Sequence, residues 1–331
     1  MKKIIPFFTI GLLLLSLGIF YWWQNAISPV NPSQKETKSF VIKRGLTVSQ
    51  IGNKLSDEGL IKSPLAFKIY LQFQGRSDQI KAGEYKFSPS ESMKSIVEKL
   101  IKGPDLVWVT FPEGLRREEI VLKLVNELEI KDKENFYLQF MQASDGKEGF
   151  LFPDTYLFPR EVVPEKLVSV LYDNFNKKIA PFQEDIKKSN MSLNEIITLA
   201  SIVERETKTD EERPLVAGIL IKRLKAGWPL QVDASVQYAV ATKNCKAFST
   251  DCKWWPILSK EDMSINSPFN SYKFKGLPPH PIANPGLSSI KAVIYPKESD
   301  YWFYLHDKSG KIYFAKTTEE HKENIRNYLA K

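Results

Sequence analysis

The chain has 331 residues, of which 43% are hydrophobic and 26% charged, a composition that excludes an intrinsically disordered protein and leaves room for two domains. Its formal net charge of +8 suits an acidic polymer or an anionic membrane surface, and equally a solvated lysine-rich face that has no partner. Nucleic acid is not an expected partner, because the sequence contains no RNA-recognition, zinc-binding or glycine-rich phosphate-binding pattern.

The first segment predicts a transmembrane helix. Residues 4–23 carry no charge, and twenty such residues span the ~30 Å of a hydrocarbon core. Lysines at residues 2–3 precede them and aromatic residues 21–23 follow, which predicts a single-pass anchor in the cytoplasmic membrane with the N-terminus inside. The alternative is a cleaved signal peptide with a small-x-small site at residues 26–28. The anchor is favoured because the apolar run exceeds the ~7 to 15 residues of a signal core, and residues 1–27 are predicted to contain a short cytoplasmic tip and the transmembrane helix.

A linker and a small module are expected next. Residues 28–39 are mostly polar with two prolines, as in a linker, and residues 40–103 predict a βααβ order followed by a further helix. The expected elements are a strand at 40–42, a helix from the Thr47/Gln50 capping box to Gly59, a helix from Ser63-Pro64 to Gly75, a strand at 85–87 and a helix at 92–101. This order is similar to that of the LysM module, which binds glycans containing N-acetylglucosamine. A small spacer domain explains the same pattern equally well.

Residues 104–331 predict a larger mixed α+β domain. The expected elements are a strand at 106–111, helices around 120–128, from Pro164, after the Ser192/Glu195 capping box and from Pro214 to Gly227, strands at 301–306 and 311–315, and a last helix capped by Thr317. Residues 148–156 form a loop rich in aromatic side chains. These side chains suit the lining of a sugar cleft, although packing against the core is the commoner use of such a loop.

Glu204 is the most informative residue for chemistry. It ends an unusually apolar helix and shares one face with residues 193, 197 and 200. An apolar setting favours the protonated carboxyl, which can then donate its proton to a leaving group. Glu206 lies about 200° around the helix axis, so the two carboxyls are not expected to act on one bond. Either could be the acid, and acidic residues at the end of a buried helix are also often no more than its solvated exit.

Four longer motifs follow in fixed order. They are LASIVERE at residues 199–206, KRLKAGWPLQVD at 222–233, SPFNSY at 267–272 and GLPPHPIANPG at 276–286. Together with the anchor, the LysM-like module and the sequence EGFLFPDTY, they resemble the endolytic murein transglycosylases of the MltG (YceG-like) family. The resemblance covers nearly the whole chain.

The resemblance implies lytic cleavage of the β-1,4 bond between N-acetylmuramic acid and N-acetylglucosamine in nascent peptidoglycan, without metal or cofactor. The family's catalytic glutamate corresponds to Glu204, which would protonate the leaving oxygen and then take the proton of the muramic 6-hydroxyl as it attacks C1. A 1,6-anhydro end would result. One carboxyl is enough for this reaction, whereas glycoside hydrolases usually use two.

Four further residues are candidates for sugar binding. Gln231, Asp233, Asn270 and Tyr272 occupy motif positions and carry groups that suit sugar hydroxyl and N-acetyl groups. Asp233 is also the one second acid considered, and it keeps open a muramidase that uses water; its alternative is a turn or N-cap residue before a helix. His280 stands where the family is expected to have a small residue, and it is interpreted as incidental to catalysis.

Cys245 and Cys252 predict a local disulfide outside the cytoplasm. A zinc site is not expected there, because none of the three histidines lies near the pair at a ligand spacing. The expected partners are glycan strands, the cytoplasmic membrane and cell-wall synthases. A glycan-binding scaffold with an idle cleft is the rival outside the enzyme class.

Overall fold

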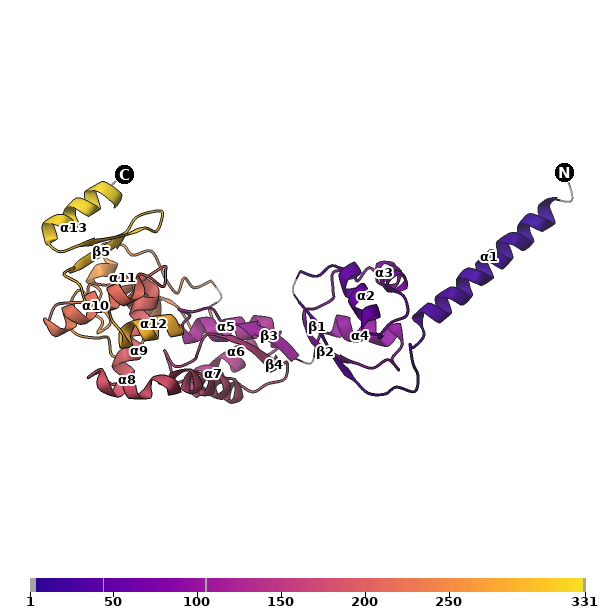
Figure 1. Cartoon of the computed structure of the whole chain (residues 1–331), viewed down its shortest axis with the longest axis horizontal. Coiled ribbons are helices and arrows are strands. Elements are labelled where there is room, and N and C mark those ends of the chain that lie inside the picture. Colours follow the sequence, from indigo (N-terminus) through magenta and orange to yellow (C-terminus); the bar gives the residue numbers. More distant parts are fainter. Residues whose placement is uncertain (1–3, 44, 105, 250, 330–331) are drawn as a thin grey trace. The chain divides into compact units, whose positions relative to one another are not determined.

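The structure, a computed structural model, describes residues 4–43, 45–104, 106–249 and 251–329, with side chains from residue 11 onward. The lysines at residues 2–3, used to predict the orientation of the anchor, lie outside the described residues. The chain forms two compact units (Figure 1), the first made of residues 1–108 with 157–160 and the second of 109–156 with 161–331. Helices and strands occur in both units, so the predicted mixed α+β class is confirmed.

Helix α1 (Ile4–Ile27) covers the predicted anchor. Over the described range, none of the helices has both the length and the apolar character that a membrane crossing needs, and the anchor stays a prediction. The C-terminal end of α1 packs against the rest of the first unit. Ala26 lies in its core, and the rings of Trp23 and Tyr70 stack with their centroids 6.3 Å apart.

The first unit has the predicted βααβ order. Strands β1 (Lys38–Ile42) and β2 (Gly83–Phe87) pair antiparallel, and helices α2 (Val48–Asp57), α3 (Pro64–Phe73) and α4 (Met93–Lys102) pack with them. The Thr47 capping box and the Ser63 cap form as expected. The predicted linker is shorter than residues 28–39, because β1 begins at Lys38 and Ser88 Oγ donates a hydrogen bond to the Gln34 carbonyl over 2.7 Å. Glycan binding by this module stays a prediction.

Two strands contribute residues to both units. Strand β3 (Leu106–Thr110) pairs antiparallel with β2, and β4 (Thr155–Pro159) follows β3 in the sheet order β1-β2-β3-β4. The sequence predicted β3 but assigned the start of β4 to a loop.

Helices dominate the second unit. They are α5 (Arg117–Glu127), α6 (Lys133–Ala143), α7 (Pro164–Ile179), α8 (Gln183–Lys188), α9 (Leu193–Glu206), α10 (Arg213–Lys225), α11 (Asp233–Asn244), α12 (Leu287–Ile294) and α13 (Thr318–Asn324). Strands β5 (Phe303–His306) and β6 (Ile312–Ala315) form the predicted hairpin. Helix α9 packs against α10, α11 and α12 (Figure 1), and its residues 196–203 are all buried. The core of the unit therefore surrounds the helix that carries Glu204.

Candidate active site

Helix α9 brings two glutamates to its C-terminal end. The helix starts at Ser192, whose side chain forms the predicted capping box with Glu195. Its buried middle leaves Glu204 and Glu206 at the exit, and the two side chains make their hydrogen bonds to different elements. The predicted separation of the two carboxyls around the helix axis therefore holds.

Two hydrogen-bond donors hold the carboxyl of Glu204. Arg213 Nη2 lies 3.0 Å from Oε1, and the backbone N–H of Gly286 donates to Oε2 over 2.9 Å. The side chain of Glu204 is only 7% exposed. A guanidinium and a backbone N–H both bind a carboxylate, so the setting is polar rather than the purely apolar one expected from the helix sequence.

A second carboxyl, which the sequence analysis did not single out, lies beside this arrangement. A Cβ atom added to Gly286 would lie 1.9 Å from Glu113 Oε1, so Glu113 packs directly on that glycine. Burial raises the pKa of Glu113, and the charge of Glu204 raises it further, whereas Arg213 lowers it. The only sequence signal was the Pro112-Glu113-Gly114 turn after strand β3.

The side chain of Asn284, two residues before Gly286, forms hydrogen bonds that connect its own loop to the loop at Leu115 and to the loop at 148–151. Its Nδ2 donates to the Leu115 carbonyl and to Glu148 Oε1, each over 2.9 Å, and its Oδ1 accepts from the Leu151 N–H over 2.8 Å. Burial raises the pKa of Glu148 to about 8. Leu151, Phe152 and Tyr156 are buried, and Phe150 is partly buried against the core. The loop at 148–156 therefore packs against the core, the commoner of its two predicted uses.

Glu206 contacts a different region. Its Oε2 accepts from the Tyr304 hydroxyl over 3.1 Å, and the Ala234 backbone N–H at the start of α11 also bonds to its carboxyl. Burial raises the pKa of Glu206 to about 7. Glu206 therefore fastens α9 to α11 and β5, a structural role that explains its position without catalysis.

Three of the four predicted sugar-binding residues meet in one cavity. Gln231, Asp233 and Tyr272 line a space of about 580 Å³ together with Glu206 and Tyr304. The Tyr272 hydroxyl donates to Asp233 Oδ1 over 2.7 Å. Asp233 is the first residue of α11, whereas the sequence alternative placed it in a turn or at the N-cap. Aromatic faces beside carboxylate and amide groups form a surface that suits a sugar ring.

Asn270 has a structural position. It is fully buried, its Nδ2 donates to the carbonyls of Met263 and Ile265 over 3.0 and 2.9 Å, and its Oδ1 accepts from the Tyr272 N–H over 3.1 Å. Its amide is therefore occupied by its own loop. The expected direct contact with sugar is corrected to the positioning of Tyr272.

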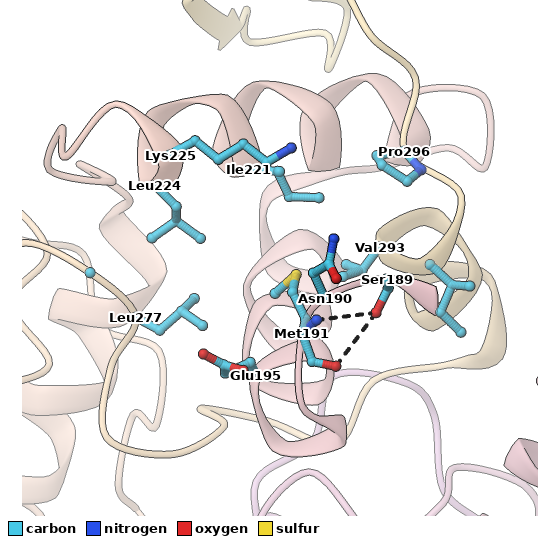
Figure 2. A pocket seen from close by; sticks show the side chains of 12 residues that line it. Ser189, Asn190, Met191, Glu195, Ile221, Leu224, Lys225, Leu277, Val293 and Pro296 are labelled. Carbon is cyan, nitrogen blue, oxygen red and sulfur yellow. Dashed lines mark hydrogen bonds between the residues drawn. The ribbon is translucent and has the colours of Figure 1, made fainter. Parts of the chain in front are cut away.

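A larger cavity of about 710 Å³ lies elsewhere in the second unit. Figure 2 shows its apolar lining, which includes Leu224, Leu277 and Val293, with Lys225 and Glu195 also present. The carboxyl of Glu195 is bonded to Ser192 at the start of α9. None of the predicted site residues lines this cavity, so we do not assign it to the reaction.

Cys245 and Cys252 are joined as a disulfide, with their Cα atoms 5.6 Å apart. The bond follows the end of α11 and closes a short loop, consistent with local stapling. In the described part of the chain, no three histidine, cysteine, aspartate or glutamate side chains are grouped so that they could hold a metal ion.

Comparison with known proteins identifies the relatives of this chain. The model of the YceG-like family matches residues 40–327. An endolytic murein transglycosylase of Bacillus subtilis is 29% identical over 338 residues, which cover 95% of this chain and 91% of the relative. An enzyme of the same name from Streptococcus pneumoniae strain D39 is also 29% identical, and the match covers 99% of this chain but only 65% of that protein.

A solved structure gives the same assignment. The crystal structure of a YceG-like protein from Listeria monocytogenes matches 87% of this chain and 99% of its own, with a TM-score of 0.60 and 29% identity. The family match covers both the first unit from strand β1 onward and the second unit up to its last turns. The chain belongs to the YceG-like family.

Proposed function

We propose that this protein is an endolytic lytic transglycosylase of peptidoglycan, with Glu204 as its general acid and base. The names of the relatives support the reaction class. The observation that carries the assignment of Glu204 is its fixed carboxyl at the end of α9, held by Arg213 and by the Gly286 N–H. The position of Glu204 in the LASIVERE motif agrees with that assignment.

In the proposed reaction the carboxyl of Glu204 first donates one proton and later accepts another. Protonated Glu204 gives its proton to the glycosidic oxygen between N-acetylmuramic acid and N-acetylglucosamine, and the C1–O bond breaks as an oxocarbenium-like centre forms. Arg213 and the Gly286 N–H stabilise the carboxylate that remains. This carboxylate accepts the proton of the muramic 6-hydroxyl while its oxygen bonds to C1. The 1,6-anhydro ring closes, and Glu204 is protonated again.

The cavity beside Glu206 provides the proposed sugar subsite. Gln231 and Asp233 offer polar groups to a sugar, and Tyr272 and Tyr304 offer ring faces. Because the Tyr272 hydroxyl is bonded to Asp233, the two residues act as one unit in this subsite.

A muramidase that uses water is the second candidate function. Asp233 was its expected second acid, but Asp233 is bonded to Tyr272 and lines the cavity of Glu206. The observation that keeps this candidate is Glu113, whose carboxyl packs on the glycine that binds Glu204. Glycoside hydrolases usually use two carboxyl groups that flank the glycosidic bond they cleave.

We further propose that α1 anchors the protein in the cytoplasmic membrane and that the enzyme works outside it, near cell-wall synthases. Support for the anchor comes from the uncharged residues 4–23 and from the exposure of the leucine side chains at 12–15, each more than half exposed. A glycan-binding scaffold with an idle cleft is the rival to the enzymatic proposal.

Mass spectrometry of digested, uncrosslinked glycan strands tests these functions. A lytic product ends in anhydro-muramic acid and is lighter by one water than a hydrolytic product. The transglycosylase predicts anhydro ends, the muramidase predicts reducing ends, and the scaffold predicts bound strands with no new ends. Reducing ends or intact strands would contradict the proposal.

A further inference from the structure

Helix α3 of the first unit has more apolar surface than the core covers. Phe67 and Leu71 are fully buried in that core. Leu65, Ile69 and Phe73, spaced four residues apart, form a second row along the helix, which we call the outer stripe. The side chain of Leu65 is 58% exposed and that of Phe73 is 87% exposed. Large apolar side chains exposed in a row on one helix are typical of an interaction surface.

The outer stripe continues onto helix α1. Ile69 and Phe73 line a space of about 490 Å³ that is otherwise lined by side chains of α1, namely Ser16, Ile19, Phe20, Trp22 and Trp23. Apart from the hydroxyl of Ser16, these side chains are aliphatic or aromatic. The exposed surface of α3 and the apolar surface of α1 therefore form one continuous face within the first unit.

The contacts between the two helices show how α3 runs along α1. Lys62, just before α3, donates through Nζ to Ser28 Oγ over 2.8 Å and to Asn25 Oδ1 over 3.2 Å, at the C-terminal end of α1. The rings of Tyr70 and Trp23 stack farther along. The last residue of α3 lines the same space as residues 16–20 of α1. Helix α3 therefore extends from the end of α1 back toward the middle of α1.

The junction between α1 and the rest of the first unit is part of the core. Ala26 is buried in the same cluster as residues of α2, α3 and α4. The two helices are therefore held to each other where α3 begins. A bilayer that surrounds α1 at the level of Phe20 would also surround Phe73, because the two side chains line one space.

Basic residues accompany the outer stripe. Lys68, on α3, and Arg76, three residues beyond its end, are both exposed. Helix α3 itself carries no acidic residue, and Asp78 is the first acidic residue after it. Basic side chains beside an apolar helix face are typical of a helix that lies in the interface of a membrane, where the charged groups reach the lipid phosphates.

We propose that α3 lies in the outer interface of the membrane that holds α1, with Phe73 at the edge of the hydrocarbon and with Lys68 and Arg76 among the lipid phosphates. The inference rests on the membrane anchor of the proposed function. In this arrangement the first unit is bound to the bilayer by two helices. It is then fixed on the membrane surface, rather than tethered by α1 alone.

Fluorescence quenching by brominated lipids tests the depth of α3. The full-length protein is reconstituted into vesicles of phosphatidylcholine and phosphatidylglycerol, with a dye on one introduced cysteine and with the Cys245–Cys252 disulfide intact. Phe73→Cys and Leu65→Cys probe the outer stripe, and Lys94→Cys, on α4 with a side chain 69% exposed, is the matched control. We expect the largest loss of emission at position 73, a smaller loss at 65 and none at 94.

Equal emission at positions 73 and 94 would overturn the inference. A dye at Leu15→Cys, within the predicted span, separates this outcome from failure of the anchor. Quenching at 15 without quenching at 73 would remove only the docking of α3, whereas no quenching at either position would remove the anchor as well. A loss of emission at 73 that disappeared on dilution of the protein in the lipid would assign the outer stripe to a second copy of the chain, and would also contradict the inference.

Discussion

The backbone N–H of Gly286 donates to the carboxylate of Glu204, a residue 82 positions earlier in the chain. Gly286 is the N-cap residue of α12, so the candidate acid and the start of that helix are fixed together. Negative charge is stabilised at the start of a helix. The carboxylate form of Glu204 is therefore held by α12 as well as by Arg213.

A side chain at position 286 should disturb this relationship. In Gly286→Ala the new methyl group would lie 1.9 Å from Glu113 Oε1, so the carboxyl or the backbone must move. Because the clashing atoms belong to the flexible Glu113 side chain, which can shift, we expect a stability loss of only about 1 kcal/mol, the low end of overpacking, together with a fall in kcat. Thermal unfolding and the rate of anhydro-end formation measure the two effects. Normal kcat in a folded Gly286→Ala protein would show that the geometry at Gly286 does not matter for the reaction.

Arg213 should be needed for its shape as well as its charge. Arg213 contacts Ser289, Asp210 and Glu204 through three different nitrogens, Nε, Nη1 and Nη2, whereas lysine at 213 keeps the charge on a single nitrogen and lacks this planar geometry. The loss of a charged hydrogen bond predicts that kcat falls about 10- to 100-fold in Arg213→Lys. Ser289→Ala leaves the bond between Arg213 and Glu204 in place, so its kcat should fall much less than that of Arg213→Lys. Equal rates in the two variants would argue against a role for the guanidinium at Glu204.

Glu148 predicts how stability depends on pH. Its pKa is raised by burial from 4.5 to about 8 in the folded chain, so the folded state keeps a proton that the unfolded state releases. Its contribution is complete below about pH 4.5 and is lost as pH rises to about 8, at about 1.4 kcal/mol per pH unit within that range. Denaturant unfolding should show that the free energy of unfolding changes less with pH in Glu148→Gln than in the wild-type protein. Parallel profiles would mean that Glu148 titrates normally.

Tyr272 should contribute to binding rather than to bond cleavage. Tyr272→Phe keeps the ring but removes the hydroxyl that donates to Asp233. We expect KM for glycan strands to rise a few-fold with kcat nearly unchanged, the pattern of lost uniform binding. Steady-state kinetics on uncrosslinked strands measure both values. A large fall in kcat with constant KM would place Tyr272 in the chemical step instead.

Helix boundaries were predictable where the signal is local. The caps at Thr47, Ser63, Ser192 and Thr317 join residues three positions apart, and all four form as the sequence predicts. Helices α11 and α12 have no side-chain cap of their own. Their first turns are bonded to Glu206 and Glu204, both contributed by α9. Such a tertiary cap is invisible in a single sequence, so α12 was missed and α11 was recognised only at its start.

The candidate site was predictable in part for a related reason. Glu204 and the cluster of Gln231, Asp233 and Tyr272 occur in motifs, and the structure brings the last three together. Glu113 could not be assigned, because its position next to Glu204 depends on the backbone bonds between residues 114–115 and Asn284. The motif predicts Asn270 as a ligand group, because the sequence does not show that the folded loop buries its amide and bonds it to Met263 and Ile265.

The role of Glu204 is tested by the rate at which Glu204→Gln forms anhydro ends, compared with wild type and with Glu211→Gln, a change at an exposed residue. The glutamine variant should fold, with an unfolding temperature close to that of the wild type, and should lose activity by about 100- to 10,000-fold, as expected for an acid–base residue. Glu211→Gln should match the wild-type rate. A folded Glu204→Gln protein that formed anhydro ends at the wild-type rate would show that Glu204 is not the acid–base residue.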